Sequence, residues 1–170
     1  AIADHNTRSL QEASKLVPGA AAFGDVAEML ATAPLDAVVV ALPTFAHAQA
    51  AKAVFESDRH LYLESPLAPN IEEGRQIVEA WRRSGLVGMI GLSSRYHPLL
   101  ADAKRSIERG DIGDLVAARI AFSSRPNSRP AWAEDPERGG GVLLDKASHE
   151  IDVVRFLVGE TYFRMGDLDR

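Results

Sequence analysis

The segment Asp36-Ala-Val-Val-Val-Ala-Leu42 is a short apolar run rich in β-branched residues, and it predicts a strand buried on both faces. Thr44 follows and is placed to cap a helix over about residues 45–56. The segment His60-Leu-Tyr-Leu-Glu64 predicts the next strand, which Ser65-Pro66 closes. A strand, a helix and a strand at this spacing form a parallel βαβ unit with a right-handed crossover.

The ends of these two strands are where a ligand is expected, because ligands of open parallel sheets bind at the carboxyl ends of the strands. The residues at those ends are Leu42, Pro43 and Thr44, with His47 nearby, and then Glu64 and Ser65. The functional interpretation begins at these two strand tips.

The rest of the first half follows the same alternation of strands and helices. Polar residues at capping positions begin helices over 7–17, 25–31 and 70–84, and further strands are expected near 1–4, 21–23 and 86–91. The strands over 36–42, 60–64 and 87–91 are predicted to be parallel neighbours with helices on both faces. The fold class is therefore α/β, with a Rossmann-like doubly wound parallel sheet.

The pattern changes near residues 93–98, where we expect a domain boundary. Beyond it the sequence predicts a helix over 98–109, a longer strand over 115–123, a loop over 124–138 and a helix over 142–158. We therefore assign 1–95 to a nucleotide-binding domain and 96–170 to the start of an α+β domain with an open sheet.

Composition excludes several classes of function. The chain has 170 residues, a net charge of -5 and no cysteine, so it lacks a broad basic surface for nucleic acid and any thiol chemistry. No apolar run approaches the ~20 residues that a membrane helix needs. A soluble, cytoplasmic protein with no nucleic-acid or membrane partner is the expectation.

Asp4 lies at a strand end, where a carboxylate can accept hydrogen bonds from ribose hydroxyls. An aspartate there is also a common turn or capping residue. The expected companion is a G-x-G-x-x-G motif about 20 residues earlier, and none occurs in the chain. Either the chain does not bind a dinucleotide, or the segment with that motif precedes Ala1.

Asp145 and His149 are four residues apart on one predicted helix and so share a face. A carboxylate beside an imidazole suits proton transfer to or from a hydroxyl, although the pair can also be an ordinary surface contact. No metal-ligand spacing and no G-x-S-x-G motif is present. Arg95 and Trp132 are expected on loops, where they can pair with or stack on a ligand.

Several motifs together resemble one family, that of glucose–fructose oxidoreductase, inositol dehydrogenase and rhizopine catabolism proteins. Asp36–His47 is similar to its D-A-V-x-I-A-T-P-x-x-x-H signature, and Arg59–Pro66 to G-K-H-V-x-x-E-K-P. The resemblance continues through Gly91–Pro98, Gly110–Gly113 and Gly139–Asp152.

The resemblance implies an NAD(P)-dependent oxidoreductase acting on a sugar- or polyol-like substrate, which forms a homo-oligomer at full length. It implies His149 and Asp145 as the groups that bind and deprotonate the hydroxyl. It also implies that the cofactor or substrate is contacted by Asp4, Leu42, Pro43, Thr44, His47, Glu64, Arg95 and Trp132. NAD is favoured over NADP because Asp4 repels a 2′-phosphate. His5, Asn6 and Arg8 can offset this repulsion.

The sequence departs from the family pattern in two respects. The lysine of E-K-P, which assists proton transfer at the reacting hydroxyl, is Ser65 here. We therefore keep Ser65 among the catalytic positions, with His149 as the acid/base, and retain an alternative function as a cofactor-binding sensor or partner subunit. Members are also about twice as long, so the chain is expected to be part of a longer protein.

Overall fold

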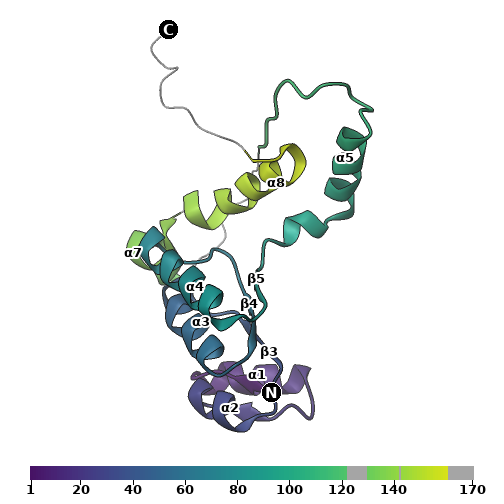
Figure 1. Ribbon diagram of the computed structural model, residues 1–170. Coiled ribbons are helices and arrows are strands. Elements are labelled where there is room, and N and C mark those ends of the chain that lie inside the picture. The colour runs from purple at the N-terminus through teal and green to yellow at the C-terminus, as the bar shows by residue number, and fades with distance from the viewer. Residues whose placement is uncertain (122–129, 142, 161–170) are drawn as a thin grey trace.

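The fold was analysed in a computed structural model, which describes residues 1–121, 130–141 and 143–160 (Figure 1). Within these residues, five strands form two parallel sheets. The first pairs β1 (Ile2–Ala3) with β2 (Ala22–Phe23), and the second contains β3 (Ala37–Val40), β4 (His60–Leu63) and β5 (Gly88–Ile90) in the order β3-β4-β5. The predicted parallel arrangement of the three main strands is confirmed. The Rossmann-like α/β class is therefore the observed fold.

Three helices of the first half begin where capping residues predicted them: α1 (Thr7–Leu16), α2 (Val26–Thr32) and α4 (Ile71–Ser84). The other helix of this half is α3 (His47–Glu56), which has no side-chain cap. Asn70 and Glu73 form a reciprocal capping box, in which the Asn70 side chain accepts from the Glu73 backbone N–H at 2.9 Å and donates to its carboxylate at 2.9 Å.

The predicted cap at Thr44 is wrong. Thr44 lies inside a 3₁₀ turn, η1 (Thr44–Ala46), in which the Ala46 backbone N–H donates to the Pro43 carbonyl at 2.8 Å. This turn precedes α3, and the side chain of Thr44 is buried and caps no helix.

The sheet β3-β4-β5 is covered on one face, which corrects the prediction of a strand buried on both faces. Val38 and Val40 are buried on the face that α3 covers, whereas Val39, between them, is 69% exposed. Among the described residues no helix lies on that second face, so the alternating geometry of the strand leaves every second side chain exposed. The buried core is built from α2, α3, α4 and the covered face of this sheet.

In its described residues, the second half consists of helices and one segment without regular secondary structure. It contains η2 (Ser93–Tyr96), α5 (Pro98–Glu108), α6 (Ala131–Glu134), α7 (Pro136–Gly139), a π-helix η3 (Leu143–Ala147) and α8 (Ser148–Val158). The predicted loop over 124–138 therefore carries two short helices in its described part. The second of them, α7, begins at Pro136, and the Asp135 side chain caps its N-terminus.

The predicted strand over 115–123 is not observed in its described part. Residues 115–121 run extended but pair with no described strand, and Val116 is 96% exposed; residues 122–123 lie outside the described residues. A β-strand requires a neighbour to exchange backbone hydrogen bonds, and sequence pattern alone does not supply one.

Candidate active site

The candidate site lies where β3 and β4 end. The strands are parallel neighbours, so the residues that follow Val40 and Leu63 emerge at the same edge of the sheet. Leu42 and Pro43 are half-buried there, and Glu64 is exposed.

The central contact of the site joins Ser65 to His149. The Ser65 hydroxyl oxygen Oγ lies 2.9 Å from His149 Nε2, although the two residues are 84 positions apart. Ser65 follows β4, and His149 is in the first turn of α8. The structure thus brings together the serine and the histidine that the sequence analysis placed at a shared site.

Asp145 precedes His149 on the same continuous helical segment, in the π-helix η3. Its Oδ2 lies 3.3 Å from Lys146 Nζ, and its side chain is 26% exposed. The carboxylate is therefore close to a cation and is one turn from the imidazole of His149 along the chain.

His47 lies behind the strand tips, not on their surface. Its ring is 1% exposed, Nε2 is 2.8 Å from the Leu42 carbonyl oxygen, and Nδ1 is 3.0 Å from the Pro66 carbonyl oxygen. The ring therefore ties the end of β3 to the backbone that directly follows Ser65. The sequence did not indicate this buried backbone contact.

Arg95 is engaged by a carboxylate of α8. It lies in the 3₁₀ turn η2, and its Nε donates to Asp152 Oδ2 at 2.7 Å while Nη2 donates to Oδ1. These hydrogen bonds raise the pKa of the Arg95 guanidinium above its ordinary value. The sequence analysis did not assign a role to Asp152, since a lone aspartate on a helix carries no signal of its partner.

Trp132 packs against the turn after β3. Its ring meets the Phe45 ring edge-on, with centroids 6.2 Å apart. The Arg138 guanidinium lies over the same Phe45 ring, 4.0 Å from its centroid. The short helices α6 and α7 are thereby held on the tip of β3 by an aromatic and cationic cluster. Phe45 and Arg138 are members of the site region that the sequence analysis missed.

Asp4 fits the role of a ribose-binding carboxylate. It follows β1, its Oδ1 accepts from the Asn6 backbone N–H at 2.8 Å, and its side chain is 37% exposed. Among the described residues no hydrogen bond engages its second oxygen, Oδ2, which is available to a hydroxyl. The residues present therefore fit the ribose and strand-tip contacts of a dinucleotide, and the 170 residues contain no glycine loop for its phosphates.

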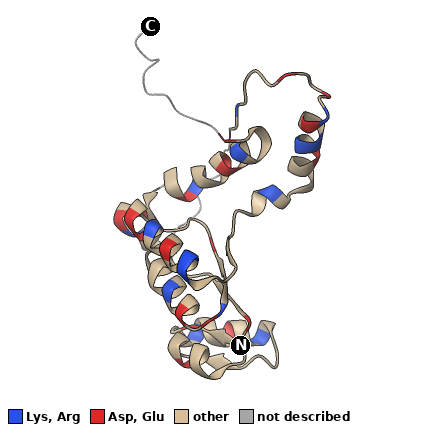
Figure 2. Ribbon diagram, in the orientation of Figure 1, with Lys and Arg blue, Asp and Glu red and all other residues tan. Residues whose placement is uncertain are grey.

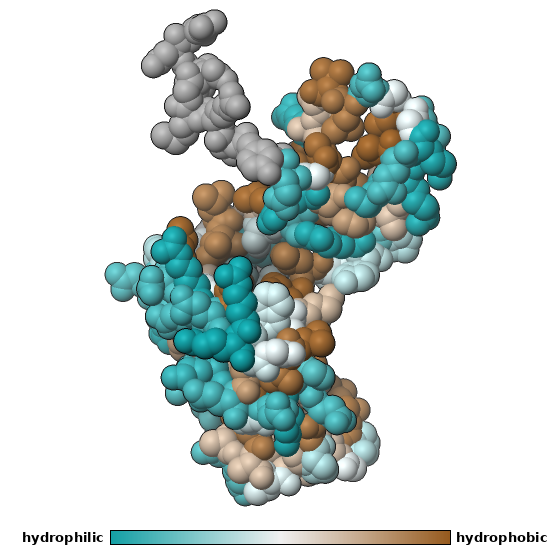
Figure 3. All heavy atoms as spheres, viewed as in Figure 1, coloured by the Kyte–Doolittle hydropathy of each residue, from teal (hydrophilic) through white to brown (hydrophobic). Residues whose placement is uncertain are grey.

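A groove of about 1090 Å³ runs between α4 and α8 and reaches Ser65 from one side. Its walls are largely apolar and include Ile71, Val78, Leu143 and Ile151. Figure 3 shows hydrophobic side chains exposed on this face of the molecule. The lining also includes polar and charged side chains, among them Ser65, Arg75 and Asp152. We place the candidate active site at the end of the groove near Ser65, where His149 meets the tip of β4.

The described residues indicate neither a metal site nor a membrane segment. Among the described histidine, aspartate and glutamate side chains, no group of three could hold a metal ion. Within the same residues, every helix is too short or too polar to span a bilayer.

Two family models match the chain. The model described as the oxidoreductase family with an NAD-binding Rossmann fold matches residues 1–92, and the model of the GFO/IDH/MocA C-terminal domain matches residues 100–164. The boundary between the two matches lies beside the domain change expected near 93–98.

Characterised proteins resemble the chain in sequence. Levoglucosan dehydrogenase of Pseudarthrobacter phenanthrenivorans is 32% identical over 164 residues, which cover 94% of this chain and 42% of that protein. The scyllo-inositol 2-dehydrogenase (NAD(+)) of Bacillus subtilis is 30% identical over 135 residues, covering 79% of this chain and 39% of that protein.

Solved structures resemble it as well. The WlbA dehydrogenase from Bordetella pertussis, in complex with NADH and UDP-GlcNAcA, matches with a TM-score of 0.80 and 32% identity, over 93% of this chain and 46% of that one. Levoglucosan dehydrogenase in complex with NADH and levoglucosan matches with a TM-score of 0.79 and 32% identity, over 94% and 44%. The chain spans less than half the length of each of these relatives, and it belongs to the GFO/IDH/MocA oxidoreductase family.

Proposed function

We propose that the full-length polypeptide is an NAD(P)-dependent dehydrogenase of a sugar- or polyol-like substrate, with His149 as the acid/base group. The observation that carries the proposal is the 2.9 Å contact between Ser65 Oγ and His149 Nε2 at the tip of β4. An imidazole held at the ligand-binding edge of a parallel sheet is suited to proton transfer near neutral pH. The relatives named above, all dehydrogenases, support the same activity.

Oxidation of an alcohol removes a hydride from carbon and a proton from oxygen. A nicotinamide cofactor, when bound, would supply the hydride acceptor. The proton passes to His149 Nε2, directly or by way of Ser65, whose hydroxyl can accept the substrate proton while giving its own to the imidazole. His149 then releases this proton to solvent, so that the pair returns to its starting state.

Ser65 makes this site depend on His149 more than the family pattern does. A serine hydroxyl is neutral and cannot lower the pKa of a substrate hydroxyl as the lysine of E-K-P can. General acid–base assistance contributes about 10²–10⁴-fold in rate, and here that contribution is proposed to come from one group, His149. Asp145, one helical turn before it, is proposed to bind the substrate hydroxyl beside His149.

We propose NAD as the preferred cofactor. Asp4 would repel a 2′-phosphate, and the polar residues near it are already engaged: the Asn6 side chain caps α1, and Arg8 Nε lies 3.0 Å from Glu12. The remaining contacts are proposed to come from the strand tips, through Leu42, Pro43, Thr44 and Glu64, with Trp132 close by on Phe45. Thr44 and His47 are buried and would support this surface from behind.

A homo-oligomer in the cytoplasm is the proposed setting. The exposed extended segment over 115–121, with Val116 96% exposed, supports an intermolecular contact. Light scattering on the protein and on Val116→Lys tests this proposal. A monomer in both cases would contradict it, whereas an oligomer lost in Val116→Lys would support it.

The function is tested by titrating the full-length protein with NADH, followed by fluorescence, and by assaying NAD-dependent oxidation of levoglucosan, scyllo-inositol and myo-inositol. We expect NADH binding and turnover of at least one hydroxyl compound. Ser65→Lys should raise kcat and leave NADH affinity nearly unchanged, and Ser65→Ala serves as the size-matched control. NADH binding without turnover in the wild type and in Ser65→Lys would contradict the dehydrogenase function and favour the sensor function.

A further inference from the structure

Arg95 and Asp152 form a two-pronged ion pair between η2 and α8. Both guanidinium contacts, Nε to Oδ2 at 2.7 Å and Nη2 to Oδ1, reach one carboxylate, and the residues are 57 positions apart. The Asp152 side chain is 6% exposed and that of Arg95 is 41% exposed. A fork of two parallel hydrogen bonds fixes orientation as well as distance.

The position of this pair relates it to His149. Asp152 is three residues after His149 on α8, so both side chains project from neighbouring positions of one helix. His149 contacts Ser65 after β4, and Asp152 contacts Arg95 after β5. Two points on α8 are thus attached to the ends of two adjacent strands.

A third contact restrains the same helix one turn further along. Lys104 Nζ of α5 donates to the Phe156 carbonyl oxygen at 2.6 Å and lies 4.7 Å from the centroid of the Phe156 ring. The Arg95 guanidinium lies 5.8 Å from the centroid of the same ring. Because this contact comes from α5 and not from the sheet, it does not by itself fix His149 against β4.

We infer that Arg95 and Asp152 are positioning residues for His149, an inference that rests on the proposed function. A single hydrogen bond between Ser65 and His149 leaves α8 free to turn about its axis, whereas a second, forked attachment one turn away removes that freedom. Acid–base groups must be held to within about 0.5 Å of their working geometry. Arg95 then acts through Asp152 and α8 rather than by contact with the reacting atoms.

The inference is tested first without turnover, by ¹⁵N NMR of histidine-labelled protein, with the His149 signals assigned from His149→Gln. Ser65→Ala gives the Nε2 signal of His149 without its partner. Arg95→Lys keeps the charge but loses the fork, and Asp152→Asn removes the charge. In both variants we expect the Nε2 signal to move toward the Ser65→Ala value.

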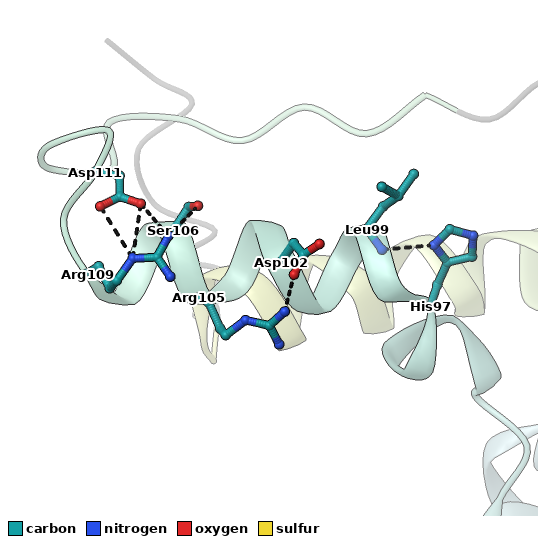
Figure 4. Close-up of polar contacts among 7 residues, drawn as sticks. All are labelled: His97, Leu99, Asp102, Arg105, Ser106, Arg109 and Asp111. Atoms are coloured by element: carbon teal, nitrogen blue, oxygen red, sulfur yellow. Dashed lines mark hydrogen bonds and ion pairs between the residues drawn. The ribbon is translucent and has the colours of Figure 1, made fainter.

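The matched control is another arginine–aspartate pair, Arg105 and Asp102 on α5 (Figure 4). Both of its side chains are exposed, at 59% and 62%, and the pair lies within one helix, so it joins no second element to α8. Arg105→Lys should leave the His149 signal at its wild-type value.

Kinetics supply the second readout. A displacement of about 1 Å costs about 10²-fold in rate, so Arg95→Lys should lower kcat by about 10- to 100-fold with the KM for NAD unchanged. Wild-type His149 signals in both Arg95→Lys and Asp152→Asn, even with reduced stability, would overturn the inference. If the protein shows no turnover, the proposed function fails, and the NMR result still decides whether the pair positions His149. Arg95→Lys keeps this test valid should Asp152→Asn not fold.

Discussion

The two halves of this molecule are each stabilised by a different kind of interaction. The first half has a core of buried apolar side chains between its sheet and helices, including Val54 at 1% exposure and Leu63 at 0%. In the second half, α5 buries no residue, and α8 buries only Asp152 and Val153. The first half therefore depends on packing, and the attachment of α8 depends on a few polar contacts.

Charge is distributed accordingly. Figure 2 shows Lys, Arg, Asp and Glu interspersed on the helices, so ion pairs are available in both halves. Among the ion pairs of the described residues, most are exposed, as Lys52–Glu56 on α3 is, and only the pair at Asp152 includes a buried carboxylate. The contribution of an ion pair to stability therefore depends on how deeply its charged groups are buried.

The largest effect is expected from truncating the core. Leu63→Ala should lower the free energy of unfolding by about 2–5 kcal/mol, because the side chain is fully buried and the cavity it leaves is only partly filled. Val39→Ala, on the exposed face of the same sheet, should change it by less than about 1 kcal/mol. Urea unfolding measures both; equal losses would show that the two faces are equally packed.

Removing the buried carboxylate of α8 comes next. Asp152→Ala should cost about 2 kcal/mol, because it removes two charge-assisted hydrogen bonds while the half-exposed Arg95 regains water. Hydrogen exchange of α8 amides should rise more than that of β4 amides. Uniform acceleration in both elements would mean that α8 is not a separately anchored unit.

The exposed pair should matter least among the ion pairs. Arg105→Ala is expected to change the free energy of unfolding by about 0–0.5 kcal/mol, since both side chains are well solvated. A loss similar to that of Asp152→Ala, measured under the same conditions, would refute the distinction drawn from burial.

Lowering the pH should reduce the stability of the C-terminal end of α8 only slightly. The hydrogen bond from Arg155 lowers the pKa of the Glu160 carboxyl below its ordinary value of 4.5. A depressed folded-state pKa means that the contribution is present at neutral pH and is lost as pH falls below about 4.5 through the folded value. Glu160→Gln should remove this acid dependence from the amide signals of α8; an unchanged dependence would assign it to another group.

Much of the first half could be predicted from sequence because its signals are local. Capping residues such as Asn70 and the apolar run at 36–42 act over a few positions, and the parallel βαβ order follows from them. The open face at Val39 could not be predicted, because an apolar run does not show whether a helix covers it.

The site was only partly predictable for the same physical reason. Ser65 and His149 were found through a family pattern, but the partner of Arg95 is 57 positions away and carries no spacing signal. His47 was expected to line a cofactor. Its buried position could not be predicted, because its partners are backbone carbonyls, which leave no pattern in the sequence. The extended segment at 115–121 read as a strand because β-propensity reflects side-chain fit and does not provide a pairing partner.

The most direct test of the account is the pH dependence of single-turnover NADH formation in the full-length protein, compared with His149→Asn. The account predicts a wild-type rate that rises with pH as one group loses its proton, and a loss of about 10²–10⁴-fold with no such dependence in His149→Asn, at unchanged NADH affinity. An equal rate and the same pH profile in the two proteins would show that the histidine bound to Ser65 is not the acid/base group.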